Sequence, residues 1–178
     1  LMAGFCDKEL LHAIRHDETE TIVEYLKHGG DPDALIGKKD ISLVVYSIKY
    51  DSPEVLTLLL KYGANPDLFV KEKSPLMWAV RDNNPELAEI LLTYGADVNS
   101  SDCKGNSALM MAGWMNRPKL CKLLISYNAN LYHEDNKGKS VVDYVNYTGC
   151  AETDYYFQLL TSYRKCIKPR EVITDGPY

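Results

Sequence analysis

Histidines and cysteines are the residues of this chain whose types could support metal or covalent chemistry. His12 and His16 lie four positions apart, a spacing that would place two imidazoles on one face of a helix. The zinc-protease pattern needs a glutamate directly after its first histidine, but Ala13 follows His12. We therefore predict that this pair is not a metal site.

The five cysteines are odd in number and form no Cys-x-x-Cys pair. Zinc sites and disulfide frameworks both use paired cysteines, so we expect reduced thiols in an intracellular protein, cytoplasmic or nuclear. The sequence also contains no nucleophile elbow, phosphate-binding glycine loop or kinase signature. We predict a chain with no catalytic residues, no metal and no other cofactor.

The composition limits the class of partner. The chain has 178 residues, a formal net charge of −5 and a pI of about 5.4. Nucleic-acid-binding domains usually carry a basic surface, so this balance argues against DNA or RNA as the partner. No apolar run approaches the roughly eighteen residues that a membrane span requires.

A phrase that is typical of a helix end recurs along the chain and is the main clue to the fold. Gly29, Gly63, Gly95 and Asn128 hold equivalent positions in it, 32 to 34 residues apart. The copies span Leu26–Asp33, Leu60–Asp67, Leu92–Asn99 and Ile125–Leu131. A period of this length is typical of stacked helical repeats.

Each repeat also carries signals for helix starts. Ser52 and Asn84 are each followed by proline and then glutamate, which is typical of a capped first helical turn. Gly63 and Gly95 stand where a helix ends in a left-handed residue. One such helix pair cannot bury its apolar stripe alone, so the core must form between neighbouring repeats.

The repeats resemble ankyrin repeats from about Leu10 to Tyr163. The close Gly95-Ala96-Asp97-Val98-Asn99 fits the family's Gly-Ala-Asp-x-Asn, and Ser74-Pro75-Leu76-Met77 resembles its Thr-Pro-Leu-His opening, although no unit keeps that tetrapeptide intact. The resemblance implies an all-α solenoid of stacked helix-turn-helix units with short β-turn fingers. We expect one domain over residues 1–165, with repeats at about 7–33, 34–67, 68–99, 100–131 and 132–165. Residues 166–178 are expected to be a tail or linker.

In ankyrin arrays the finger tips and the inner helices line a concave groove, so the resemblance assigns positions to a partner-binding surface. It places Ile41 and seven lysines on the tips, namely Lys38, Lys39, Lys71, Lys73, Lys104, Lys137 and Lys139. Such an edge favours an acidic segment of another protein, although Asp40, Glu72 and Asp102 lie close enough to weaken its field. Exposed turns are often rich in lysine, which leaves a merely solvated edge as the alternative.

The same register points five inner-helix residues toward the groove: Tyr50, Arg81, Trp114, Met115 and Tyr147. Tyrosine, tryptophan and arginine are enriched in binding hot spots. Tyr46 and Trp78 lie one turn earlier and are expected to pack between repeats instead. Trp114 is the strongest candidate, because Leu109 and Ala112 already supply the apolar positions of its helix.

We therefore predict a non-catalytic protein–protein interaction module that is monomeric by itself. Two alternatives stay open. The chain could be the substrate-recruiting ankyrin domain of a larger enzyme, adaptor or pathogen effector acting on host proteins, in the last case in the host cytosol. The lysine edge could instead bind nucleic acid, which the acidic pI disfavours.

Overall fold

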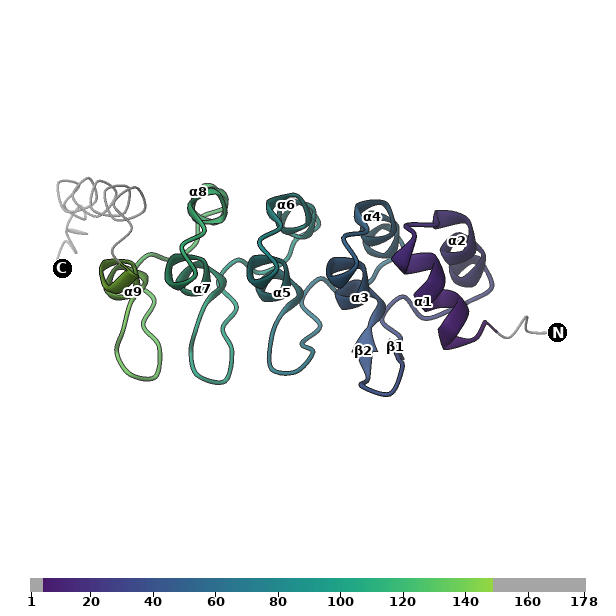
Figure 1. Ribbon diagram of the computed structural model, residues 1–178, viewed down its shortest axis with the longest axis horizontal. Helices are drawn as coiled ribbons and strands as arrows, with labels where there is room; N and C mark the ends of the chain where they lie inside the picture. Colours follow the sequence, from purple (N-terminus) through teal and green to yellow (C-terminus); the bar gives the residue numbers. More distant parts are fainter. Residues whose placement is uncertain (1–4, 149–178) are drawn as a thin grey trace, which may run out of the picture.

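The computed structural model describes residues 5–148, and side chains are described as far as Val145. The expected tail and the second half of the fifth repeat lie outside this part of the chain. Figure 1 shows two parallel rows of helices, with loops that project from one side of the inner row like fingers. The predicted all-α solenoid with short β-turn fingers is confirmed.

Each of the first four units contributes one inner helix, then one outer helix, and the described part of the fifth contributes an inner helix. The inner row is α1 (Asp7–Arg15), α3 (Leu43–Lys49), α5 (Pro75–Arg81), α7 (Ala108–Trp114) and α9 (Val141–Thr148). The outer row is α2 (Thr19–Lys27), α4 (Pro53–Lys61), α6 (Pro85–Thr93) and α8 (Pro118–Ser126). We number the units one to five from the N-terminus, each unit from two to five beginning with its finger.

Four fingers precede the inner helices of units two to five. The first is an antiparallel hairpin of β1 (Leu35–Ile36) and β2 (Ile41–Ser42), with Ile36 paired to Ile41. The next two, residues 68–74 and 100–107, are each closed by a single antiparallel bridge. The fourth comprises residues 132–140. It is closed by a hydrogen bond from the N–H of Asp135 to the carbonyl of Lys139 at 2.9 Å.

The helix ends follow the local signals with one correction. Outer helices α4, α6 and α8 begin at a proline as expected, and Gly63 and Gly95 after α4 and α6 have φ of +89° and +90°. Asn84 caps α6, accepting from Leu87 N at 3.1 Å. Ser52, however, does not cap α4, because its buried hydroxyl donates to the carbonyl of Ile14 in unit one.

The carboxylate of Asp17 caps α4 in place of Ser52. It accepts from the backbone N–H of Val55 at 2.9 Å and of Glu54 at 3.4 Å. Asp17 lies in the loop between α1 and α2 with φ +54°, so the helix of unit two begins on a side chain from unit one. The cap is therefore also a contact between repeats.

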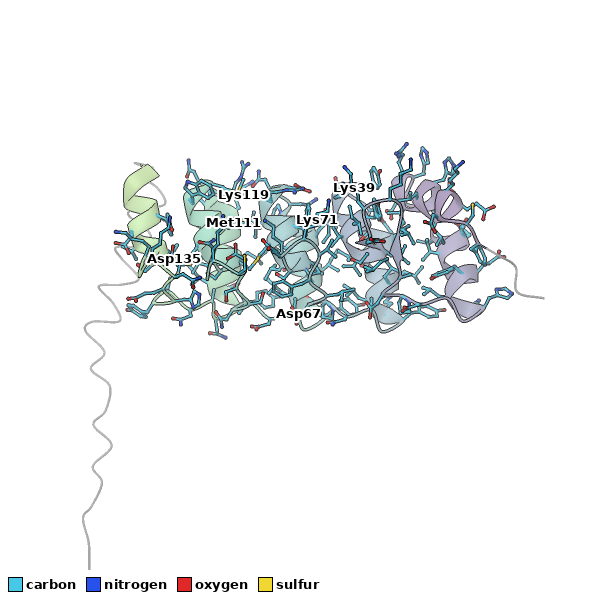
Figure 2. All side chains as sticks on the ribbon, turned by 90° about the horizontal axis from the view of Figure 1, so that it is seen from below. Lys39, Asp67, Lys71, Met111, Lys119 and Asp135 are labelled. Atoms are coloured by element: carbon cyan, nitrogen blue, oxygen red, sulfur yellow. The ribbon has the colours of Figure 1, made fainter. Side chains whose placement is uncertain are left out.

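A hydrogen-bond ladder joins the units at the turn after each outer helix. Asp33 accepts from Asn65 N at 2.8 Å, Asp67 from Asp97 N at 2.9 Å, and Asn99 from Asn130 N at 2.7 Å. The acidic or amide residue that closes each of these repeats is thus an acceptor for the next one. Figure 2 shows Asp67 at one long edge of the solenoid, away from Lys39 and Lys119 near the opposite edge.

The core lies between the helix rows and between neighbouring units, as the repeat pattern requires. Leu59 of α4 and Leu91 of α6 are fully buried, as are Leu76 of α5 and Ala112 of α7. Gly113 allows α7 and α9 to approach closely, because a Cβ there would lie 2.9 Å from Cγ2 of both Val141 and Val145. This close approach sets the position of the last described helix.

Candidate functional site

A hollow of about 840 Å³ lies between the last two fingers and the inner helices α7 and α9. We call it the unit-four hollow. Its apolar lining comes from Met110, Met111, Trp114 and Tyr144, and its cationic lining from Lys73, Lys104, Lys137 and Lys139. The side chain of Trp114 is 62% exposed, although it stands on a helix whose other face is buried.

The hollow brings together five residues that the sequence assigned to a partner-binding surface: Lys73, Lys104, Trp114, Lys137 and Lys139. Three other assigned lysines, Lys38, Lys39 and Lys71, are exposed on the first two fingers, outside the hollow. Met115 is half-buried at the C-terminal end of α7. Tyr147 lies in α9, but its side chain is outside the described part.

One predicted contact residue is wrong. Ile41 is only 2% exposed, because it stands on β2 with its side chain packed in the core beside Ile36. A finger has two faces, and the register of its hairpin turns this residue inward. Ile41 cannot contact a partner without unfolding the finger.

Two other predicted contacts already have partners within the chain. Arg15 donates to the hydroxyl of Tyr50 at 3.2 Å and lies 5.0 Å from the centre of its ring. Arg81 lies 4.0 Å from the centre of the Trp78 ring and is ion-paired with Asp82 at 2.8 Å. Trp78 and Tyr46 are 6% and 8% exposed, which confirms that they pack within the array.

Unlike Arg81, the four lysines of the hollow have no ion-pair partner in the described part of the chain. Their surroundings include the carboxylates of Asp102, Asp135 and Asp143. These three carboxylates would cancel most of the lysine charge if they were equally free.

Each of these carboxylates is instead surrounded by donors from its own finger or helix start. Asp102 accepts from the N–H groups of Lys104 and Asn106, both at 2.9 Å. Asp143 accepts from the N–H and the hydroxyl of Ser140, which lower its pKa. These bonds hold each carboxylate in place, and the lining carries four ammonium groups against three carboxylates, an excess of one positive charge.

Asp135 is the most deeply placed of the three. The hydroxyl of Tyr144 donates to its Oδ2 at 2.5 Å, and the N–H groups of Lys137 and Lys139 donate to its Oδ1 at 2.8 and 2.9 Å. The Tyr144 bond, followed by these N–H groups, holds the pKa of Asp135 below its usual value. Asp135 is therefore ionised at neutral pH and fixes the shape of the last finger.

The two fingers that border the hollow are fastened to each other. Asn136 donates its backbone N–H to the carbonyl of Lys104 at 3.0 Å and its side-chain amide to the carbonyl of Cys103 at 3.1 Å. His133 Nε2 lies 2.8 Å from the carbonyl of Gly105, which requires the tautomer with a proton on Nε2. The ammonium groups of Lys104 and Lys137 thus extend from one rigid pair of fingers.

Met111, Tyr144 and Asn136 line this site, but none of the three was among the residues assigned to partner binding from the sequence. The register carried a signal for the first two, because Met111 holds the position of α7 that Tyr46, Trp78 and Tyr144 hold on α3, α5 and α9. Figure 2 shows Met111 on α7, between the two long edges of the solenoid. Asn136 carried no such signal, since its role depends on how two fingers lie side by side.

A second hollow, of about 590 Å³, lies at the N-terminal end, where Phe5, Lys8 and His12 meet three glutamates. The rings of His12 and His16 are 4.5 Å apart there. Across residues 5–148, no group of three or more histidine, cysteine, aspartate or glutamate side chains is arranged to hold a metal ion. None of the helices in that same range is long and apolar enough to cross a membrane.

Comparison with known protein families identifies the repeats. A family model for ankyrin repeats, in three copies, matches residues 10–102 and again residues 45–135. These two matches together cover more than half of the chain and run through α1 to α8. No curated protein matches the sequence.

Proposed function

The chain belongs to the ankyrin repeat family, and we propose that it binds an acidic segment of another protein in the unit-four hollow. Ankyrin repeats are generally protein–protein interaction modules and are typically non-catalytic. The specific proposal is that the partner is acidic and that the site is this hollow rather than the whole inner face.

One observation carries the proposal. Four lysines whose ammonium groups have no ion-pair partner in the described chain line the same hollow as Trp114, a large aromatic residue that is 62% exposed. Leaving such a ring in water gives up apolar burial that a partner would recover, and tryptophan is the residue type most often found at binding hot spots. Positive charge around it steers an acidic partner and excludes a basic one.

The rigid pair of fingers supports the same site. A surface that is already ordered loses less conformational entropy on binding than a flexible one. The bonds from Asn136 to Cys103 and Lys104 fix this geometry before any partner arrives. Binding should therefore need little rearrangement of the backbone.

The test is a comparative capture from eukaryotic cell lysate, read by mass spectrometry. One variant changes Lys104, Lys137 and Lys139 to glutamate. A matched control changes Lys27, Lys61 and Lys119, three exposed lysines of the outer helices, to glutamate as well. Both variants have the same net charge, so only the position of the charge differs.

We expect a protein that the parent chain and the control both capture and that the hollow variant loses. If the hollow variant captures it as well as the control does, the lysines of the hollow are only a solvated edge. Loss by both variants would mean that overall charge, and not this site, holds the partner.

A further inference from the structure

Met111, which lines the unit-four hollow, interrupts a row of aromatic residues. On α3, α5 and α9 the fourth residue after the serine that precedes the helix is Tyr46, Trp78 or Tyr144. On α7 the residue at this position is Met111, which follows Ser107 by the same interval. The four residues hold equivalent positions on α3, α5, α7 and α9, which are successive helices of the inner row (Figure 1).

The three rings of the row fill the space between their helix and their own finger. Trp78 Nε1 donates to the carbonyl of Val70 at 3.1 Å, and the Tyr144 hydroxyl donates to Asp135 at 2.5 Å. The hydroxyl of Tyr46 lies so close to its finger that a Cβ on Gly37 would be 2.9 Å from it. Each aromatic side chain thus closes its own unit.

Met111 leaves its unit open. Its side chain is half-buried. In the part of the chain that the structure describes, this side chain makes no hydrogen bond to the finger of residues 100–107, although the backbone N–H of Met111 bonds to the carbonyl of Ser107. A methionine has no ring to span the gap and no N–H or O–H to bond the finger carbonyls. The unit-four hollow opens beside it.

In units two and three the residue three positions after the row member is a cation, whereas in units four and five it is an aromatic residue, Trp114 or Tyr147. Lys49 lies 5.6 Å from the centre of the Tyr46 ring and Arg81 lies 4.0 Å from that of Trp78, so a cation covers each ring. In unit four this position is Trp114, which carries no charge and whose ring no cation covers in the described residues. Unit four therefore combines an unfilled ring position with an exposed indole.

We propose that the unit-four hollow takes one aromatic side chain from the acidic partner segment, which completes the row. The ring would rest on the thioether of Met111 and beside Trp114, where sulfur–aromatic and aromatic–aromatic contacts are both favourable. Carboxylates on either side of that ring would lie near Lys104, Lys137 and Lys139. The inference rests on the proposed function and adds the chemistry that the partner must present.

The probe is a fluorescein-labelled peptide, Glu-Glu-Phe-Glu-Glu, whose binding is measured by fluorescence anisotropy. Two comparison peptides replace the phenylalanine by serine or all four glutamates by glutamine. We expect each replacement to weaken binding at least about tenfold, because each removes one of the two kinds of contact. This comparison uses the parent chain alone and does not depend on any variant.

The second part of the test fills the hollow with an aromatic side chain of the protein itself. Met111→Trp and Met111→Tyr place on α7 the aromatic ring that the other units have, and Met111→Leu keeps the volume without a ring. We expect the two aromatic variants to weaken peptide binding at least about tenfold and to melt no lower than the parent. Met111→Leu leaves the hollow open and loses only the sulfur–aromatic contact, so it should weaken binding less than either aromatic variant does. If Met111→Trp folds poorly, Met111→Tyr carries the same test.

Four results would overturn the inference. The serine peptide could bind as tightly as the phenylalanine peptide, or the aromatic variants could bind as tightly as the parent. Heparin or single-stranded DNA could displace the phenylalanine and serine peptides equally, which would make the hollow a general polyanion site. A captured partner that is lost with the lysine variant but kept by Met111→Trp would overturn this inference alone and leave the proposed function standing.

Discussion

The indole Nε1–H of Trp78 donates a 3.1 Å hydrogen bond to the backbone carbonyl of Val70 and so ties helix α5 to its own finger. Tyr144 ties α9 to its finger in the same way, through the carboxylate of Asp135. Met111 makes no comparable bond among the described residues, and the hollow opens at its unit. The closed units support the array, and the open unit is the one we assign to binding.

Trp114 should matter for binding and not for folding. Because its side chain is 62% exposed, Trp114→Ala should change the free energy of unfolding by no more than about 0.5 kcal/mol. Leu91 is fully buried, so Leu91→Ala should lower it by roughly 2–5 kcal/mol. Urea denaturation measures both values. A similar loss for the two variants would show that Trp114 belongs to the core.

Asp17→Ala should lower the free energy of unfolding by about 0.5–2 kcal/mol, the usual effect of losing a helix cap. The change removes the acceptor for Val55 N–H, and alanine is also strained at the positive φ of this residue. Asp17→Asn keeps an oxygen acceptor and tolerates that conformation, so it should lose much less. Equal losses for both variants in urea denaturation would exclude a capping role.

Asp67→Asn should stabilise the array at neutral pH. Burial raises the pKa of Asp67 above its usual 3.8, so folding favours the uncharged form. The ionised carboxylate therefore lowers stability at pH values above its folded pKa, and this penalty disappears as the pH falls through that pKa toward 3.8. Asparagine avoids the penalty and can still accept from Asp97, as Asn99 does from Asn130.

The measurement for Asp67 is urea denaturation of the parent and Asp67→Asn between pH 7 and pH 3. We expect the variant's advantage to be largest at pH 7 and to shrink toward acid. An advantage that is constant with pH, or a loss at every pH, would contradict the assigned ionisation.

Tyr144→Phe should have the opposite pH dependence. The Tyr144 hydroxyl lowers the pKa of Asp135, so this carboxylate contributes stability above its usual value of 3.8 and loses it as the pH falls through the lower folded pKa. Removing the hydroxyl moves the folded pKa back toward 3.8. The variant should therefore be less stable than the parent at pH 7, and the difference should close in acid. A difference that is the same at every pH would show that only packing was lost.

The repeat period predicted the fold well because the residues that recur with it are those that start and end helices locally. Prolines at helix starts and glycines at helix ends act within one or two turns, so their positions in the sequence are enough to place α4, α6 and their ends. The cap of α4 could not be predicted in this way. It comes from Asp17, whose contact with the helix depends on how two units stack.

The site was predicted only in part for a similar reason. Exposure of Trp114 followed from the apolar positions already filled on its helix, whereas Ile41 was placed outside because a finger was treated as having one face. Tyr50 and Arg81 have the residue types of hot spots, but contacts with Arg15, Trp78 and Asp82 engage them. A residue-by-residue register does not show such contacts, whether they join two helices, as Arg15 and Tyr50 do, or lie within one, as those of Arg81 do.

The most direct test of the proposed site is the ¹H–¹⁵N NMR spectrum of the chain with and without its captured partner. The chain has two tryptophans, so its indole region holds two signals, and Trp114→Phe assigns them. Our account predicts that the partner shifts or broadens the Trp114 signal and leaves that of Trp78, which is bonded to Val70, in place. Saturating partner with an unchanged Trp114 signal would contradict it and move the binding site away from the unit-four hollow.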